Sequence, residues 1–269
     1  MNYMKPQRIM LNEGNYYSNE TDIDYMSFSQ LKDFMECPAR AMAIIERKWE
    51  KPTTDAMLQG SYIDAYFSGE MEKFKAEHPD VINKRTGEPL VKFAICEEVI
   101  KSILDDKGFY EALYHGNAQT ILTGEIAGVA FKGKLDFLQE DKIIDMKAMR
   151  SIEDVWSDAE RRYVPFWKAY RYDLQAAIYR ELVRQNTGKT LPYYLAVATK
   201  ETPSKHLCYR FGDDVLDSAL KEVQSLAPTF DRYKKHEEVP PECGKCDWYW
   251  ASHKFDMTFD VQLITEGKE

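Results

Sequence analysis

The sequence predicts a mixed α/β (α+β) domain, in which a central mixed sheet with a three-strand meander is flanked by helices. Three observations predict this class. Short segments rich in branched and aromatic residues follow one another over residues 120–146, helical patterns lie on both sides of them, and two more strand-like segments come before the last long helix. With 269 residues and 44% hydrophobic side chains, the chain is long enough to bury this sheet in one core.

The N-terminal part is predicted to be an irregular segment followed by helices. Residues 1–25 are polar and weakly periodic, so we expect an irregular lead-in there. Ser27 and Gln30 fit a capping box, which predicts the start of a helix. Pro38 predicts that this helix breaks or kinks just after residue 37, because proline cannot continue the hydrogen-bond ladder.

The rest of the chain alternates between the periodicity of helices and the composition of strands. Helices are predicted over residues 57–67, 93–104, 170–184 and 213–235. Strands are predicted over residues 120–126, 129–138, 142–146, 191–198 and 207–211. One domain over residues 26–236, with a charged insertion near 69–92, would therefore hold the sheet, and a cysteine-containing tail follows over residues 237–269.

Composition limits the class of protein. The chain has 45 acidic and 36 basic residues, and this net charge of −9 disfavours a protein that simply coats DNA. No segment approaches the roughly 18 apolar residues of a membrane span, and no apolar signal core follows the first methionine. We therefore expect a cytoplasmic protein without a membrane partner, whose cysteines are considered as metal ligands before disulfides.

Two carboxylates and an ammonium group fall on neighbouring predicted strands. Asp136 lies in a strand that otherwise looks buried, and Asp145 and Lys147 are two residues apart on the next one, so their side chains share a face. Carboxylate oxygens bind Mg²⁺, which polarises a phosphoryl oxygen, while a nearby lysine offsets charge that develops on the phosphate. These residues predict a metal site, and the alternative is a structural ion pair between Asp145 and Lys147.

The segments around these residues resemble motifs II and III of the PD-(D/E)xK nuclease superfamily. They read GKLDFL over residues 133–138 and IIDMK over residues 143–147, and the predicted order of elements resembles that superfamily's restriction-endonuclease-like core. The resemblance implies that Asp136 and Asp145 bind Mg²⁺ or Mn²⁺, that Lys147 is the catalytic lysine, and that the backbone carbonyl of Met146 is a further metal ligand.

Two further motifs indicate which branch of the superfamily the chain resembles. Gln175 and Tyr179 fit the Q-x-x-x-Y motif of the RecB-like branch, and their spacing of four places them on one helix face. The resemblance implies that they contact DNA or orient the metal ligands. Residues 27–32, SFSQLK, followed by Cys37 and Pro38, resemble the S-x-S-x-L-K…C-P opening of the RecE-type (exonuclease VIII-like) exonucleases of phages and prophages.

One position departs from the pattern of that branch. The branch carries a metal-binding histidine in a G-x-x-x-H segment, and this chain has Asp64 at that place after Gly60. Aspartate also binds Mg²⁺ or Mn²⁺, so Asp64 is a candidate ligand in a more anionic site. The alternative is a solvated helix residue and a weakened enzyme. Glu125 is a weaker candidate for an additional acid.

A basic and aromatic stretch comes directly before the Gln175 helix. Residues 161–171 contain four basic and four aromatic side chains and no acidic one. Because basic side chains bind phosphates and aromatic rings stack on bases, this stretch predicts a DNA-binding surface. The predicted contacts are Arg161, Arg162, Lys168 and Arg171. Phe166 and Trp167 are as readily explained as core residues.

The cysteines form a second candidate metal site. Cys243 and Cys246 make a C-x-x-C pair, and the family resemblance implies that such a pair joins an early cysteine, here Cys37, to hold an iron–sulfur cluster. A full cluster takes four thiolates, and Tyr249 stands where a further cysteine is expected. A zinc ion, with His253 as a fourth ligand, and a remnant site with free thiols are the alternatives.

Together these features predict a metal-dependent exonuclease that hydrolyses phosphodiester bonds in linear double-stranded DNA. The resemblance implies a homo-oligomer that acts in phage or prophage recombination beside a single-strand annealing protein. The acidic charge and Asp64 motivate an alternative from another class, a catalytically weak or inactive nuclease-fold module that binds DNA. An endonuclease of the same fold is a third possibility.

Overall fold

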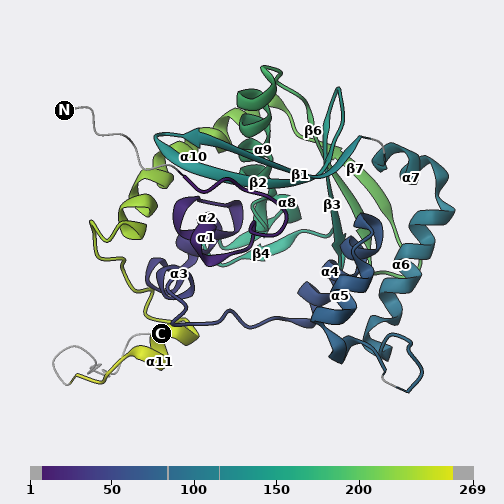
Figure 1. The fold of residues 1–269 in the computed structure, drawn as a ribbon, viewed down its shortest axis with the longest axis horizontal. Coiled ribbons are helices and arrows are strands. Elements are labelled where there is room, and N and C mark those ends of the chain that lie inside the picture. The colour runs from purple at the N-terminus through teal and green to yellow at the C-terminus, as the bar shows by residue number, and fades with distance from the viewer. Residues whose placement is uncertain (1–7, 84, 115, 257–269) are drawn as a thin grey trace.

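A five-stranded mixed sheet forms the centre of the protein in the computed structural model, which describes residues 8–83, 85–114 and 116–256 (Figure 1). Its strands, in the spatial order β1-β2-β3-β6-β7, are β1 (Asn117–Ile126), β2 (Val129–Leu138), β3 (Ile143–Met149), β6 (Tyr193–Thr199) and β7 (His206–Arg210). β6 runs parallel to β3, and the other neighbouring pairs are antiparallel. The predicted mixed sheet with its three-strand meander is confirmed.

Helices cover this sheet. They are α1 (Asn19–Asp24), α2 (Phe28–Glu36), α3 (Pro38–Ile45), α4 (Asp55–Ser68), α5 (Met71–Glu77), α6 (Ala94–Asp105), α7 (Lys107–Leu113), α8 (Phe166–Ala169), α9 (Tyr172–Thr187), α10 (Asp213–Lys234) and α11 (Asp247–Ser252). The 3₁₀ turns η1 (Pro79–Val81) and η2 (Val91–Phe93) lie between α5 and α6. None of the helices in the described part of the chain is long and apolar enough to cross a membrane.

Both faces of the sheet are buried, and β6 shows how. Leu195 and Val197 pack into the core that contains α9 and α10, while Ala196 and Ala198 pack into the clusters beneath α4, α6 and α7. Successive side chains of a strand point to opposite faces, so a strand covered on both sides must be apolar throughout. This arrangement explains the apolar run of β6.

The N-terminal helices follow the predicted signals closely. Ser27 Oγ accepts a hydrogen bond from the backbone N–H of Gln30 at 3.2 Å and caps α2. α2 ends at Glu36, and Pro38 then occupies the first turn of α3, where its missing N–H costs nothing. The segment expected as an irregular lead-in contains α1, which is capped by Ser18.

Lys132 of β2 joins this lead-in to the sheet. Its side chain is almost fully buried, and Nζ donates to the Tyr16 carbonyl at 2.5 Å and to Thr21 Oγ1 at 3.0 Å. Asp22 Oδ1 lies 2.8 Å from the same nitrogen. Burial lowers the pKa of Lys132, and the hydrogen bond with Asp22 opposes that shift. The lead-in is therefore an integral part of the fold.

A small hairpin between β3 and α8 has no counterpart among the predicted elements. It pairs β4 (Val155–Ser157) with β5 (Arg162–Val164). Each strand has three residues, which is too short for an alternating pattern to stand out from a loop. Arg161, at its turn, has a left-handed backbone with φ of 49°.

Candidate active site

The central strand β3 carries the core of the candidate site. Asp145 is 1% exposed, and its Oδ2 forms an ion pair with Lys147 Nζ. Gln175, on the overlying helix α9, donates from Nε2 to Asp145 Oδ1 at 3.0 Å. Three of the predicted site residues therefore meet in one hydrogen-bonded group.

Asp136 reaches this group through an irregular point in β2. The β1–β2 register pairs Leu135 and Phe137 with β1 but passes over Asp136, where β1 has Gln119 with φ of 51°. Leu135 packs in the core with α9, whereas Phe137, two residues on, packs beneath α7. Since residues two apart in a regular strand share a face, the strand is kinked at Asp136.

The kink directs the Asp136 carboxylate towards β3. Its Oδ2 accepts a hydrogen bond from the backbone N–H of Met146 at 2.9 Å. Met146 lies between Asp145 and Lys147, so this bond fixes the two carboxylates relative to each other. The β2–β3 pairing covers Phe137 and Leu138 only, so β3 can offer this N–H to a side chain.

Asp64 approaches the same group from α4, which packs against β3. Although Asp64 keeps an exposed surface, nearby protein atoms that displace water, and then the negative charge of Asp136, raise its pKa to about 6. The ammonium group of Lys147 acts in the opposite direction. Asp64, at the position where the RecB-like resemblance implies a histidine, therefore interacts electrostatically with the site.

Negative charge exceeds positive charge within the site. Burial raises the pKa of Asp145, and the neighbouring Lys147 opposes that shift. Burial alone would lower the pKa of Lys147, but the carboxylates of Asp145 and Asp136 outweigh it and raise that pKa. Lys134 also acts on Asp64, yet the three acids still outnumber the two lysines, and a cation would neutralise the excess negative charge.

The donor atoms fit a hard divalent cation. Carboxylate oxygens are the ligands that Mg²⁺ prefers, and Asp64, Asp136 and Asp145 supply them. Buried Gln175 Oε1 has no hydrogen-bond partner among the residues that the structure describes. The carboxylate oxygens of Asp64, Asp136 and Asp145 do not all lie within 4.8 Å of one another, whereas the three cysteine sulfurs do, so in the described chain the acids form a looser group than the cysteines.

Tyr179 lies one turn beyond Gln175 and is a packing residue as well as a neighbour of the site. It is 7% exposed, and a Cβ atom placed on Gly133 of β2 would lie 2.9 Å from its ring and 3.0 Å from Leu182 Cδ1. The absence of a side chain at Gly133 therefore lets α9 approach the sheet closely enough for Gln175 to reach Asp145.

Gly133→Ala is expected to destabilise the protein by about 1–3 kcal/mol, as overpacking of a dense core does. The displaced α9 would also weaken the contact between Gln175 and Asp145. Chemical denaturation measures the effect. Gly60→Ala in α4 is the matched control, because its Cβ would meet no atom within 4 Å, and alanine stabilises a helix by about 0.5–1 kcal/mol relative to glycine. Equal stability of Gly133→Ala and the wild type would contradict the packing argument.

A cavity of about 290 Å³ opens beside this site, and sequence reasoning did not predict it. Its lining includes Gln175 and Tyr179 of α9, Ser27 at the start of α2, Tyr17 of the lead-in, and Lys134 of β2. Lys134 Nζ lies 5.7 Å from the centre of the Tyr17 ring. The signal available in the sequence was the pair of lysines, at 132 and 134, in the same strand as Asp136.

The predicted basic stretch is only partly available for DNA. Glu160 pairs with both Arg162 and Lys168, and Arg171 pairs with Asp173 and Glu222. Arg161 is exposed at the hairpin turn. DNA would have to compete with these acids, so the DNA contact of the four basic residues stays a prediction.

The structure also shows where the two aromatic residues of this stretch and the additional candidate acid lie. Phe166 is buried, and Trp167 packs edge-on against Phe211 with the ring centres 5.6 Å apart, so both belong to the core. Glu125 lies at the β1–β2 turn, opposite Ala130 and 3.8 Å from Arg8. Asp136 is at the other end of that strand pair, so Glu125 is remote from the acids.

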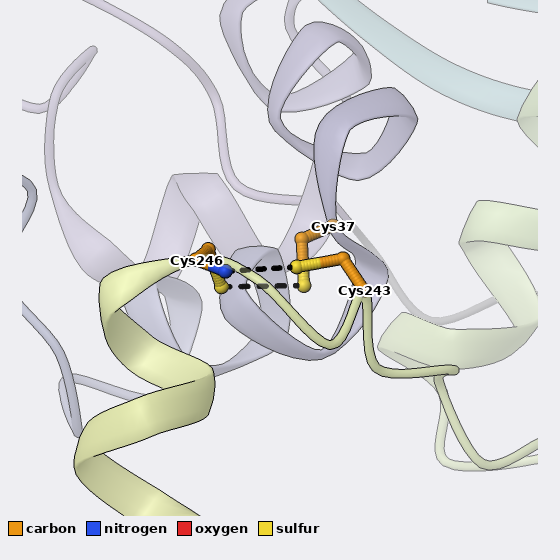
Figure 2. Close-up of side chains that lie close together, drawn as sticks. All are labelled: Cys37, Cys243 and Cys246. Atoms are coloured by element: carbon orange, nitrogen blue, oxygen red, sulfur yellow. Dashed lines mark hydrogen bonds between the residues drawn. The ribbon is translucent and has the colours of Figure 1, made fainter. Parts of the chain in front are cut away.

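The three predicted cysteines meet at a different place in the fold (Figure 2). Cys37 links α2 to α3, Cys243 lies in the loop after α10, and Cys246 precedes α11. Their sulfur atoms all lie within 4.8 Å of one another.

The mixed sheet, its helices and the Asp–Asp–Lys group define a domain of the PD-(D/E)xK superfamily. The sequence model of a family described as "PDDEXK-like domain of unknown function (DUF3799)" matches residues 27–251, and the chain belongs to this family. The matched region begins at the N-cap of α2 and extends into α11. No curated protein matches the chain.

A solved structure shares the whole architecture. The crystal structure of a "Putative exonuclease" from Eubacterium rectale superposes with a TM-score of 0.88 at 34% sequence identity. The match covers 96% of this chain and 97% of the other. The predicted fold class is therefore confirmed along nearly the full length.

Proposed function

We propose that this protein is a divalent-metal-dependent DNA exonuclease of the RecE type, acting on linear double-stranded DNA. The observation that carries the proposal is the meeting of Asp136, Asp145, Lys147 and Gln175 at the centre of the sheet. The structural relative described as a "Putative exonuclease" supports it.

Each residue has a task in this proposal. Asp64, Asp136, Asp145 and the Met146 carbonyl would hold Mg²⁺ or Mn²⁺, which supplies Lewis-acid polarisation of the phosphate and activation of water. Lys147 stays charged because its pKa is raised, and its side chain is 24% exposed, so it can reach a phosphate. Gln175 orients Asp145 through its hydrogen bond, and Tyr179 supports α9, the helix that carries both residues, by packing against Gly133.

The biological setting belongs to the same proposal. It comprises a cytoplasmic homo-oligomer that takes part in phage or prophage recombination beside a single-strand annealing protein. The support is the SFSQLK opening and the Q-x-x-x-Y motif, whose elements, α2 and α9, both line the cavity beside the acids. DNA would approach over this cavity, and Arg161 at the turn of the β4–β5 hairpin is the exposed basic residue proposed to contact it.

Lys147→Ala is expected to slow the release of nucleotides from linear duplex DNA with Mg²⁺ by about 10²–10³-fold, the usual effect of removing one group that stabilises transition-state charge. The matched control is Lys189→Ala, which removes an exposed lysine after α9 and should leave the rate unchanged. Acid-soluble nucleotide release measures both rates. Equal rates for wild type and Lys147→Ala would refute the mechanism.

Two substrates separate the alternatives. Degradation of linear duplex with closed circular duplex left intact would support an exonuclease, and cleavage of the circle would indicate an endonuclease instead. If wild type bound DNA but cleaved neither substrate with Mg²⁺ or Mn²⁺, the protein would be a DNA-binding module of the nuclease fold.

A further inference from the structure

The three-cysteine group has the geometry of a metal site separate from the acids. Cys37 is 1% exposed, while Cys243 and Cys246 are half-buried. The Sγ atoms of Cys37 and Cys246 are 3.8 Å apart (Figure 2). Two thiolates bound to one tetrahedral zinc ion, each about 2.3 Å from the metal, are separated by about 3.8 Å. A disulfide requires about 2.05 Å, so the observed spacing matches shared coordination.

The backbone also directs hydrogen-bond donors at these sulfurs. The N–H of Cys246 donates to Cys243 Sγ at 3.3 Å, and the N–H of Tyr249 donates to Cys246 Sγ at 3.4 Å. Gly244 makes the turn possible, because its φ of 72° lies in the left-handed region. Such donors stabilise the thiolate form, which is the form that binds metal.

The number of sulfur ligands distinguishes a site for an iron–sulfur cluster from a site for a zinc ion. A four-iron cluster takes four thiolates, and the described chain brings three cysteines together, with Tyr249 in place of a fourth. The other two cysteines are elsewhere, Cys96 buried in α6 and Cys208 exposed on β7. The iron–sulfur cluster that the resemblance implies therefore does not fit, whereas one zinc ion does.

We propose that the thiolates of Cys37, Cys243 and Cys246 bind one Zn²⁺ ion, which fastens the C-terminal segment to the junction of α2 and α3. The fourth ligand of the tetrahedral zinc ion would be a group other than these three cysteines.

The C-terminal segment already contacts the N-terminal part of the chain near the three cysteines. The residues of α11, all of them described, are not buried. A hydrogen bond from the Ala39 N–H to the Pro241 carbonyl at 3.2 Å and an edge contact of Trp248 with Trp49, ring centres 5.8 Å apart, join the segment to α3 and to the loop after it. A metal ion held by the cysteines would add to this attachment, as structural zinc does in small domains.

Metal content of the full-length protein tests this proposal. Protein purified under reducing conditions without chelators is expected to contain one zinc ion per chain that survives dialysis against Mg²⁺. Cys243→Ala should lose this zinc, and Cys208→Ala, the matched control, should keep it. Asp136→Asn should also keep it, which separates the cysteine site from zinc bound by the acids.

Cobalt provides a second measurement that does not depend on how the variants fold. Addition of Co²⁺ to the metal-free wild-type protein is expected to produce a sulfur-to-cobalt charge-transfer absorption, which carboxylate ligands cannot give. His253→Ala identifies the fourth ligand, because a changed cobalt spectrum assigns it to the histidine and an unchanged one to solvent.

Three results would overturn the proposal. They are a folded protein that holds no zinc and gives no cobalt–thiolate absorption, a preparation that contains iron and acid-labile sulfide, and a mass spectrum that shows a disulfide among these cysteines. None of these measurements involves DNA cleavage, so their outcome is independent of the nuclease assay.

Discussion

Asp136→Asn is expected to lower Mg²⁺-dependent release of nucleotides by about 10²–10³-fold and to leave the fold intact. The asparagine carbonyl can still accept the hydrogen bond that Asp136 Oδ2 receives from the Met146 N–H. The substitution therefore removes one negative charge from the proposed metal ligands without removing the contact that positions the strand.

Asp141→Asn is the matched control for this variant. Asp141 is an exposed carboxylate at the β2–β3 turn, so the control makes the same change in charge and volume five residues away. The rates of nucleotide release and the thermal unfolding midpoints of the two variants are to be compared. Full activity in Asp136→Asn would remove this residue from the site, and a large fall in its unfolding midpoint would show that the role is structural.

Lys132→Met is expected to destabilise the protein by roughly 3–5 kcal/mol, the range found when one partner of a buried ion pair is removed. Methionine fills the space but leaves the Tyr16 carbonyl and the Thr21 hydroxyl without their buried donor, and Asp22 without its cation. Urea denaturation measures the free energy of unfolding. Partial loss of the lead-in should appear as faster proteolysis near Tyr16.

An exposed ion pair serves as the control for Lys132. Lys92 Nζ lies 2.7 Å from Asp55, and the two side chains are 44% and 60% exposed. Because exposed pairs contribute about 0–1 kcal/mol, Lys92→Met should change the unfolding free energy by less than about 1 kcal/mol. If both lysine variants were equally stable, the buried contacts of Lys132 would contribute nothing and the lead-in would be held by other groups.

The sequence alone was sufficient to predict the sheet and the strand that carries Asp145 and Lys147. Short apolar segments separated by turns define the meander, and a spacing of two places the aspartate and the lysine on one face. The capping box at Ser27 and the start of α3 at Pro38 are local signals of the same kind. These features depend on neighbours in sequence, which a pattern can detect.

Contacts between distant segments could not be predicted where no motif links the two segments. Lys132 and Asp22 lie 110 residues apart in the sequence, and no local sequence pattern predicts that they form a pair. The partners of the basic stretch were missed for a similar reason, since Arg171 pairs with Glu222 of α10. The kink at Asp136 depends on packing against two separate groups of helices, and the alternation of residues in β2 does not reveal it.

That kink couples the candidate site to packing at a distance. Leu135 packs in the core with α9 and Phe137 packs beneath α7, so the carboxylate between them lies at the boundary of two cores. Both side chains are buried. A change in volume at either position is therefore expected to move Asp136, so selection could adjust the candidate site through residues that supply no candidate ligand.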